Sequence, residues 1–201
     1  SGVLLAAKSQ EADRAFKMRL EERSIEAARA AESGGPVGRA DKTYLAVTWG
    51  VPPDGLVDLP LEADPSPLRV KMRVTTPGSG FAARTGVRVV ATTGRYALVE
   101  CQLYTVRQHQ IRVHLSHLGT PVVGDKLYGP DERLLARSAD NELTDDDVEL
   151  LELPRHALHA YRHRLTHCFS GEELVITAPF PEDLTDFWLD RDGLLEDLEN
   201  L

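Results

Sequence analysis

The segment VRVVATTGRYALVECQLY, at residues 87–104, constrains the fold more than any other part of the sequence. It is rich in β-branched and aromatic residues, which favour extended strands. Residues 92–94, in its middle, have the composition of a tight turn. We therefore predict a β-hairpin, with two antiparallel strands side by side.

Further segments fit strands, and a smaller number fit helices. The predicted strands are residues 43–50, 70–74, 156–165 and 173–180, and the predicted helices are residues 9–23, 108–118 and 183–190. In the first helix Ser9 is the N-cap, and Ala12, Phe16 and Leu20 share one face. Gly119 is a suitable left-handed cap for the second helix. Strands and helices do not alternate as βαβ units, so we predict an α+β fold with a mostly antiparallel sheet.

The remaining segments define the expected domain organisation. VLLAAK, at residues 3–8, is typical of a buried strand, and a domain rarely begins inside its core. We therefore expect the chain to be the downstream part of a longer domain that covers residues 1–190. Within it we expect a surface insertion at 27–41 and an acidic segment at 131–153 that forms a loop or short exposed helices. Residues 191–201 are expected to be an acidic tail.

Composition excludes some classes of protein. The net charge of −9 argues mildly against a nucleic-acid binder, although residues 104–117 contain arginines and histidines and no acid. There is neither an apolar run of about eighteen residues nor a signal peptide, so we expect a cytoplasmic protein without a membrane partner. Without a secretory signal, Cys101 and Cys168 are expected to be reduced core thiols.

The sequence around residue 110 is rich in histidine, but its spacing does not favour a metal site. On a helix His109 would point roughly 140° away from His114, so only His114 and His117 share a face. No CxxC or HExxH motif supplies further ligands. The chain also lacks a GxSxG elbow and a phosphate-binding glycine loop, which leaves little support for hydrolytic or nucleotide-binding chemistry.

Arg112 is the most informative single residue. The predicted helix places it beside an apolar stripe that includes Ile111 and Leu115, and the apolar segment VVGDKLYG follows. An unpaired charge in such surroundings is costly, so Arg112 requires an anion. Composition leaves two partners open, a carboxylate of this chain or a phosphate.

Several motifs, in order along the chain, resemble one family. RQHQIRVHL at 107–115, followed by LG at 118–119, PVVGD at 121–125 and YG at 128–129, is similar to the GRTHQIRVHL…LGHPVVGDxxYG signature of RluA-type pseudouridine synthases. SGVLLAAK at 1–8, the helix and turn at 16–26, KTYLA at 42–46, RHALHA at 155–160 and AP at 178–179 resemble further motifs of the family. The resemblance extends to about residue 183 and implies the pseudouridine synthase catalytic-domain fold, incomplete at its N-terminus.

The resemblance also implies an activity. Family members detach uracil from C1′ of a uridine, rotate it and rejoin it through C5, without a metal or cofactor. Their key residue is the aspartate of an HRLDxxT motif, which acts as a nucleophile or electrostatic partner. No aspartate of this chain matches it, and Asp13 lies on the following helix. We expect the motif to lie upstream of Ser1.

Two residues match catalytic positions of the family. Arg112 matches the arginine that pairs with the catalytic aspartate, which would make that aspartate the anion expected above. Tyr44 matches the active-site tyrosine, whose ring stacks on uracil and whose hydroxyl is a candidate for proton removal. Asp125 is expected to organise the VVGD turn. The residues expected to contact RNA are Arg107, His109, Gln110, Arg155 and His159.

The implied partner is ribosomal or transfer RNA that presents a flipped uridine in a stem-loop to a monomeric enzyme. Val106, Gln108 and Thr120 depart from the family signature, so the loop before the Arg112 helix is expected to differ in shape. Two alternatives remain open. One is a non-catalytic RNA-binding relative that lacks the aspartate, and the other is an acidic interaction module that uses 131–153 and the tail.

Overall fold

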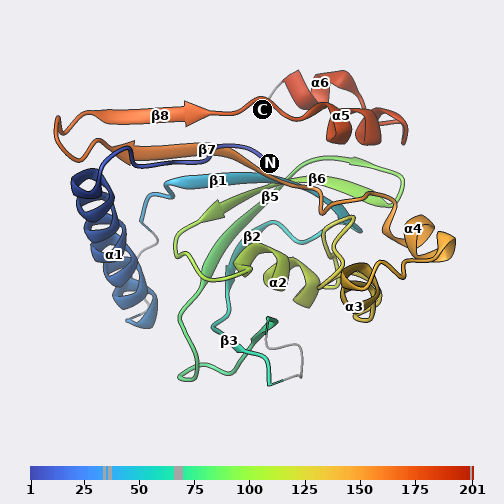
Figure 1. Ribbon diagram of the computed structural model, residues 1–201, viewed down its shortest axis with the longest axis horizontal. Coiled ribbons are helices and arrows are strands. Elements are labelled where there is room, and N and C mark those ends of the chain that lie inside the picture. Colours follow the sequence, from blue (N-terminus) through green and yellow to red (C-terminus); the bar gives the residue numbers. More distant parts are fainter. Residues whose placement is uncertain (34, 36–37, 66–69, 200) are drawn as a thin grey trace.

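A six-stranded sheet forms the body of the computed structural model, which describes residues 1–201 apart from 34, 36–37, 66–69 and 200. The strand order is β2-β5-β6-β1-β7-β8, and each of these ladders is antiparallel (Figure 1). A separate two-stranded sheet contains β3 and β4. The strands are β1 (Lys42–Trp49), β2 (Gly55–Asp58), β3 (Leu61–Ala63), β4 (Met72–Val74), β5 (Arg84–Thr93), β6 (Tyr96–Leu103), β7 (Leu158–Thr166) and β8 (Glu173–Thr177). The predicted α+β class is confirmed.

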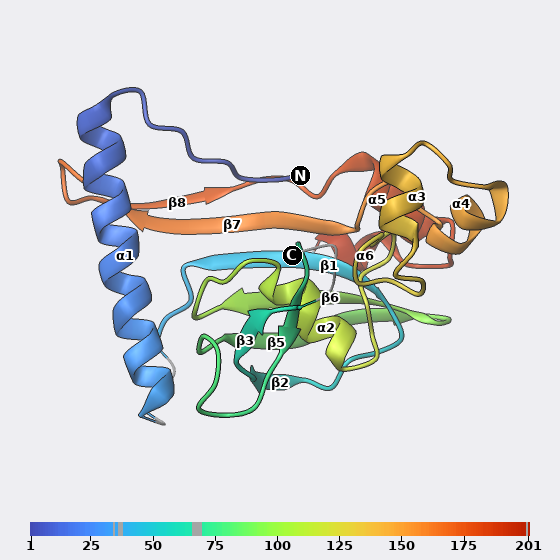
Figure 2. The same ribbon diagram turned by 60° about the horizontal axis from the view of Figure 1, so that its bottom comes forward.

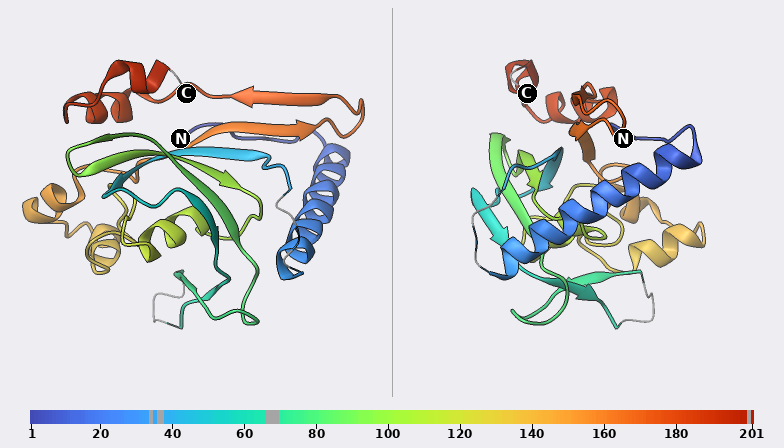
Figure 3. Two further views of the ribbon diagram at one scale, coloured as in Figure 1. Left: turned by 180° about the vertical axis from the view of Figure 1, so that it is seen from behind. Right: turned by 90° about the vertical axis from the view of Figure 1, so that its left-hand side faces the viewer.

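The helices lie around the sheet. They are α1 (Gln10–Glu32), α2 (Gln110–His117), α3 (Leu134–Ala139), α4 (Asp145–Leu151), α5 (Glu182–Leu189) and α6 (Leu195–Glu199). Figures 1 and 2 show α1 at one end of the sheet and α3 and α4 at the opposite end, while α2 covers one face. The view from behind in Figure 3 shows the same arrangement, with α1 standing apart from the other helices, and in the side view α1 runs across the front of the molecule.

The predicted hairpin is present as β5 and β6. Gly94, with φ +50, lies in the turn between them, and Thr93 pairs with Tyr96 across it. β6 then pairs with β1 in unbroken register, from Lys42 opposite Leu103 to Trp49 opposite Tyr96. β1 is therefore an interior strand with buried residues on both faces. Its pairing with β6 on one side and β7 on the other fixes the position of each of its residues.

The short strands β2 and β3 were not predicted. Each contains only three or four residues, which is too short for an alternation of apolar and polar side chains to be visible. β2 pairs with the first half of β5, and β3 pairs with β4.

The first helix is longer than predicted. α1 continues to Glu32, whereas the sequence suggested an end near residue 23 and a surface insertion from 27. The segment that extends it is rich in alanine, which has the highest helix propensity of all residues. The predicted helix end near residue 23 was wrong for this reason, and part of the expected insertion at 27–41 lies outside the described residues.

Residues 3–8 do not form the predicted buried strand. Gly2 makes only an isolated parallel bridge to Ala160, supported by a hydrogen bond of 2.8 Å from the Val3 amide to the Ala160 carbonyl. The Leu4 side chain is 88% exposed. The two sides of β7 already pair with β1 and β8, so they offer residues 3–8 no long free edge.

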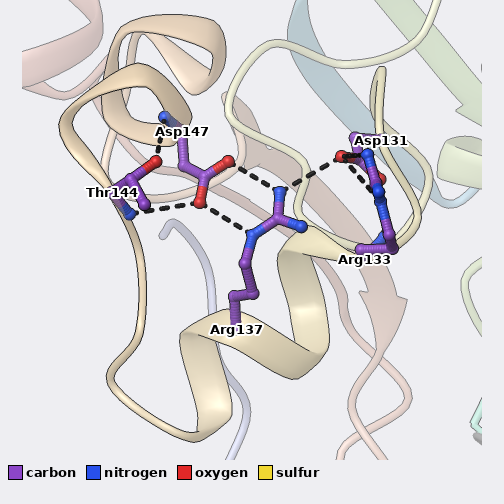
Figure 4. Close-up of polar contacts among 5 residues, drawn as sticks. All are labelled: Asp131, Arg133, Arg137, Thr144 and Asp147. Carbon is purple, nitrogen blue, oxygen red and sulfur yellow. Dashed lines mark hydrogen bonds and ion pairs between the residues drawn. The ribbon is translucent and has the colours of Figure 1, made fainter.

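The acidic segment 131–153 folds as two short helices, α3 and α4. Figure 4 shows Arg137 between the carboxylates of Asp147 and Asp131, at 2.6 Å and 3.1 Å from its Nη2 atom. Thr144 and Asp147 form a capping box at the start of α4. The segment was expected to be exposed, but it is exposed only in part, because Asp147 and Leu151 are buried. Several of its acids are neutralised within the segment.

The C-terminal region is attached to the sheet through one carboxylate. Glu152, in a left-handed conformation with φ +62, accepts hydrogen bonds from four side chains. The donors are Trp49 of β1, Arg95 and Tyr96 at the β5–β6 turn, and Arg191 after α5. This hub links the end of α4, the sheet and the beginning of the predicted acidic tail.

Three smaller findings complete the description. Cys101 is buried, Cys168 is partly buried, and both are free thiols. Within the described ranges, no helix is long and apolar enough to cross a membrane. The same residues contain no group of three or more His, Cys, Asp or Glu side chains placed to hold a metal ion.

His114 of α2 gives the fold a predictable dependence on pH. Its buried imidazole accepts a hydrogen bond from Thr85 through Nδ1 (2.9 Å) and donates one to the Leu59 carbonyl through Nε2 (3.0 Å), which fits the neutral ring. Burial lowers the pKa of His114 to about 4. Between the unfolded value of about 6.5 and this value, the unfolded chain binds a proton that the folded protein does not.

We therefore expect the free energy of unfolding to fall as the pH decreases from about 6.5 to about 4, by up to roughly 3 kcal/mol from this one residue. Urea denaturation at several pH values measures the effect. His163 has a similarly lowered pKa and adds to the wild-type slope, so the comparison is with His114→Gln. In this variant the pH dependence of the free energy of unfolding should correspond to about one proton fewer taken up on unfolding. An unchanged pH dependence would contradict the assignment to His114.

Candidate functional site

A groove between α1 and the sheet is the first candidate site. Its volume is about 670 Å³, and residues 3–8, α1, β1, β7 and β8 contribute to its walls. Ala12, Phe16 and Leu20, predicted to share one face of the helix, all line it. A groove of this size with an apolar wall is typical of sites that bind small molecules or single nucleotides.

Tyr44 lies in this groove. β1 carries it between Thr43 and Leu45, both buried, and the Tyr44 side chain points into the cavity with Lys42, two residues earlier on the same face. Burial raises the pKa of Tyr44, so its hydroxyl is protonated at neutral pH. The ring provides a flat apolar surface, and the hydroxyl provides a neutral donor or acceptor.

The groove is also positively charged. Among the described residues, four cationic side chains line it against one carboxylate, that of Asp13, which pairs with Lys17 at 2.8 Å. They are Lys8, Lys17, Lys42 and Arg162. This local excess contrasts with the net charge of −9 for the whole chain, and it favours an anionic ligand.

Arg112 of α2 has a carboxylate partner within this chain. Its Nε and Nη2 atoms donate to the two oxygens of Asp125 at 2.6 Å and 2.7 Å, and Asp125 is fully buried. Of the two partners that composition left open for Arg112, the structure therefore shows the carboxylate of this chain, and not the missing aspartate, as the anion that Arg112 already binds. The reason is geometric, because the turn after α2 brings the side chain of Asp125 back to the helix.

Asp125 does organise the turn, as expected. One of its oxygens also accepts the backbone N–H groups of Leu127 and Tyr128, each at 2.9 Å. Burial alone would raise the pKa of Asp125, but the hydrogen bonds and charge of Arg112, together with these two amides, lower it below its usual value. Asp125 is therefore an ionised anchor for Arg112.

One guanidinium nitrogen of Arg112 remains available. Within the described residues, Nη1 of Arg112 has no hydrogen-bond partner, and the guanidinium lies 4.9 Å from the centre of the Tyr128 ring. His156 is close enough for the charges of Arg112 and Asp125 to act on it. Its pKa is lowered mainly by burial and also by the positive charge of Arg112. A second anion can therefore approach Arg112 without displacing Asp125.

Tyr128 is a site residue to which the sequence assigned no role. Its hydroxyl accepts the Met72 amide of β4 at 2.8 Å and lies 2.9 Å from Nδ1 of His109. It thereby connects the β3–β4 pair to the start of α2. The YG of the family signature was the available signal, but a motif letter does not identify a contact to a strand more than fifty residues earlier.

Two residues expected to contact RNA are internal. Gln110 is 2% exposed, and its amide bonds to Thr105, the Arg107 amide, Thr85 and the Arg84 carbonyl. His159 is also 2% exposed, with Ser1 Oγ 3.1 Å from Nδ1 and the Ala178 carbonyl 3.3 Å from Nε2. Because their polar atoms bond within the protein, these side chains have structural roles in place of the expected RNA contacts.

The other three residues expected to contact RNA lie nearer the surface. Arg107 donates to the Ala82 carbonyl and lies over the ring of Phe81. His109 has a left-handed backbone, with φ +56, as the N-cap of α2. Arg155 forms a two-point ion pair with Asp183, which offsets its charge.

The predicted site residues thus fall in two places. Tyr44 lies in the groove, whereas Arg112 is not among the described residues that line it. Arg112, Asp125, His109 and Tyr128 form a second cluster between α2 and the following turn.

The Arg112–Asp125 pair should dominate local stability. Arg112→Met leaves a buried carboxylate unpaired, so we expect the free energy of unfolding to fall by about 3–5 kcal/mol. Adding Asp125→Asn to this variant should restore part of the lost stability. Asparagine is neutral, and its side-chain oxygen still accepts hydrogen bonds from the two turn amides. Arg88→Met, which removes an exposed partner of Glu100, should cost at most about 1 kcal/mol. Equal losses for the Arg112 and Arg88 variants in urea denaturation would contradict the pairing.

Curated relatives support the resemblance found in the sequence. A protein of Chloroflexus aurantiacus described as an uncharacterized RNA pseudouridine synthase is 43% identical over 147 residues, which are 73% of this chain and 40% of the relative. The ribosomal large subunit pseudouridine synthase D of Nitrosomonas europaea is 34% identical over 202 residues, covering 100% of this chain and 49% of the relative. The chain thus spans less than half the length of these two relatives.

Solved structures support the fold. Human RNA pseudouridylate synthase domain containing 4 is 29% identical, with a TM-score of 0.52, and the match covers 72% of this chain and 59% of that one. Human RNA pseudouridylate synthase domain containing 1 shares the fold at 24% identity, with the same TM-score of 0.52 and coverages of 79% and 61%.

The family model described as RNA pseudouridylate synthase matches residues 1–117, which is more than half of the chain. Together with the shared fold and the signature around Arg112, this match shows that the chain belongs to the RNA pseudouridylate synthase family, in the RluA-type group.

Proposed function

We propose that the protein is an RNA pseudouridine synthase, an isomerase that converts uridine to pseudouridine in RNA. The observation that carries the proposal is the placement of Tyr44 in a positively charged groove of about 670 Å³. An aromatic ring beside cationic side chains suits a base with its phosphates, since bases stack on aromatic rings and phosphates bind cations. Family membership supplies the reaction.

In this reaction the N1–C1′ bond of uridine breaks, a C5–C1′ bond forms, the proton on C5 is lost, and N1 gains a proton, so that the overall change is an isomerisation. We propose that the ring of Tyr44 stacks on the flipped uracil and that its hydroxyl takes part in removing the C5 proton. Because burial raises the pKa of Tyr44, the hydroxyl is neutral at physiological pH. It can accept the C5 proton only if it passes its own proton to another base or to water.

For Arg112 we propose a positioning role. With Nε and Nη2 bound to Asp125, its remaining Nη1 group can orient the family's nucleophilic aspartate, which no residue of this chain matches. Fixing the guanidinium on one carboxylate before a second arrives reduces the side-chain entropy lost when the site assembles.

We further propose that the substrate is ribosomal RNA, as the names of several relatives indicate for those proteins. Arg107, His109 and Arg155 remain proposed RNA contacts at the surface. We propose that the protein acts as a cytoplasmic monomer and binds a flipped uridine in a stem-loop of this RNA. Transfer RNA is the second candidate substrate.

Deletion of the gene tests the function in the organism that carries it. We expect pseudouridine to disappear from one or a few uridines of the ribosomal RNA, as mapped by carbodiimide labelling and primer extension. The wild-type gene should restore the modification. An unchanged map in ribosomal and transfer RNA would refute the enzymatic proposal and favour the non-catalytic RNA-binding alternative.

Two substitutions separate the roles of Tyr44. With protein expressed from its native gene, Tyr44→Phe should keep RNA affinity but reduce single-turnover tritium release from C5-labelled uridine by about 10²–10⁴-fold. Tyr44→Ala should in addition weaken binding, by about 1–3 kcal/mol for the lost stacking. Full turnover by Tyr44→Phe would show that the hydroxyl takes no part in removing the proton.

A further inference from the structure

Lys42 and His163 form a pair of polar side chains that the proposed chemistry does not use. Lys42 is the first residue of β1 and lies directly opposite His163 of β7 in the antiparallel register. Directly opposed residues project from the same face of a sheet and have neighbouring Cβ atoms. The two side chains therefore lie side by side.

Both side chains lack a bonding partner in the part of the chain that the structure describes. Among the described residues, nothing forms a hydrogen bond or ion pair with the Lys42 ammonium or with the His163 ring, although His163 is only 8% exposed. Burial lowers the pKa of both residues, while Asp41 raises that of Lys42. Buried polar groups are nearly always satisfied, so an unpartnered lysine beside an unpartnered buried histidine calls for a ligand.

The pair stands between two cavities. Lys42 and His163 line both the Tyr44 groove and a second cavity of about 280 Å³ between α1, the segment before β1, and β5. Charged residues on the walls of the second cavity are Arg23 and Glu26 of α1, Arg39 and Asp41 before β1, and Arg84 of β5.

Lys42 differs from the other cations of the second cavity in having no bonded carboxylate. Among the described wall residues, Arg23 is bound to Asp41 at 2.8 Å and Arg39 pairs with Glu173 at 3.5 Å. Arg84 is bound to Asp58. No described carboxylate bonds to Lys42, so a ligand for this position must be an anion or a hydrogen-bond acceptor.

We propose that Lys42 and His163 bind a backbone phosphate of the RNA, adjacent to the nucleotide whose base enters the Tyr44 groove. Lys42 and Tyr44 are two residues apart on one strand face, about 6.6 Å in the direction of the strand. This separation is similar to that between a base and a neighbouring phosphate of the same strand. Lysine supplies the charge, and the neutral imidazole donates an N–H to a phosphate oxygen. The inference rests on the proposed function in taking RNA as the ligand.

The salt dependence of RNA binding provides the test. The probe is a five-nucleotide oligouridylate, measured by fluorescence anisotropy from 50 to 200 mM NaCl with the 201-residue chain. For Lys42→Met we expect affinity to fall roughly five- to tenfold at the lowest salt and the log–log salt slope to decrease by about 0.7, the value for one phosphate of a single strand. Lys42→Arg, which keeps the charge, should retain the slope.

Lys71→Met is the matched control. The Lys71 ammonium is already bound to Glu132, and Lys71 lies outside both cavities. The salt dependence of RNA binding by Lys71→Met should therefore equal that of the wild type. If the slopes of Lys42→Met and the wild type are equal, or if the wild type does not bind the oligonucleotide, the proposal is wrong. Because the measurement concerns binding, it fails or succeeds independently of the pseudouridine map.

The imidazole of His163 reports on the site directly. A bound phosphate should raise the pKa of His163 from about 4 by at least one unit, as followed by NMR titration of the ring, with the same oligonucleotide and with inorganic phosphate. If inorganic phosphate moves the His163 resonance and the oligonucleotide does not, the site binds free anions only and the RNA assignment is refuted. No movement with either ligand would also refute it.

Discussion

The fully buried carboxylate of Asp125 is the constraint around which the candidate site is organised. A buried carboxylate remains ionised only when donors compensate for its lost hydration. Asp125 obtains these donors from Arg112 and from the amides of Leu127 and Tyr128. One side chain therefore fixes the guanidinium of the helix and the backbone of the turn after it.

Several further contacts depend on that turn. Because the turn is fixed, the Tyr128 ring lies against the Arg112 guanidinium and its hydroxyl reaches β4. Gln110 and His114, on the same helix, attach α2 to β5 through Thr85. The helix that carries the family signature is thus bonded to β5 at its start and near its middle, which restricts the movement of Arg112.

The charge distribution resolves an apparent conflict between an acidic chain and the proposed RNA substrate. The net charge is −9, but many acids lie in the 131–153 segment, where Arg137 and Arg133 pair with Asp131 and Asp147. That segment and α1 lie at opposite ends of the sheet (Figure 1). The groove at the α1 end has an excess of cations. The distribution of charge over the surface, and not its sum, therefore decides where a polyanion can bind.

The sequence by itself determined the fold class, the hairpin of β5 and β6, and the family. These depend on local composition and on motif spacing, which are written along the chain. Tertiary structure decided what each motif residue contacts. It gave Arg112 the carboxylate of Asp125, withdrew Gln110 and His159 into the interior, and placed Lys42 opposite His163. Such pairings depend on strand register and on the path of a turn, and residues far apart in sequence meet only when both are fixed.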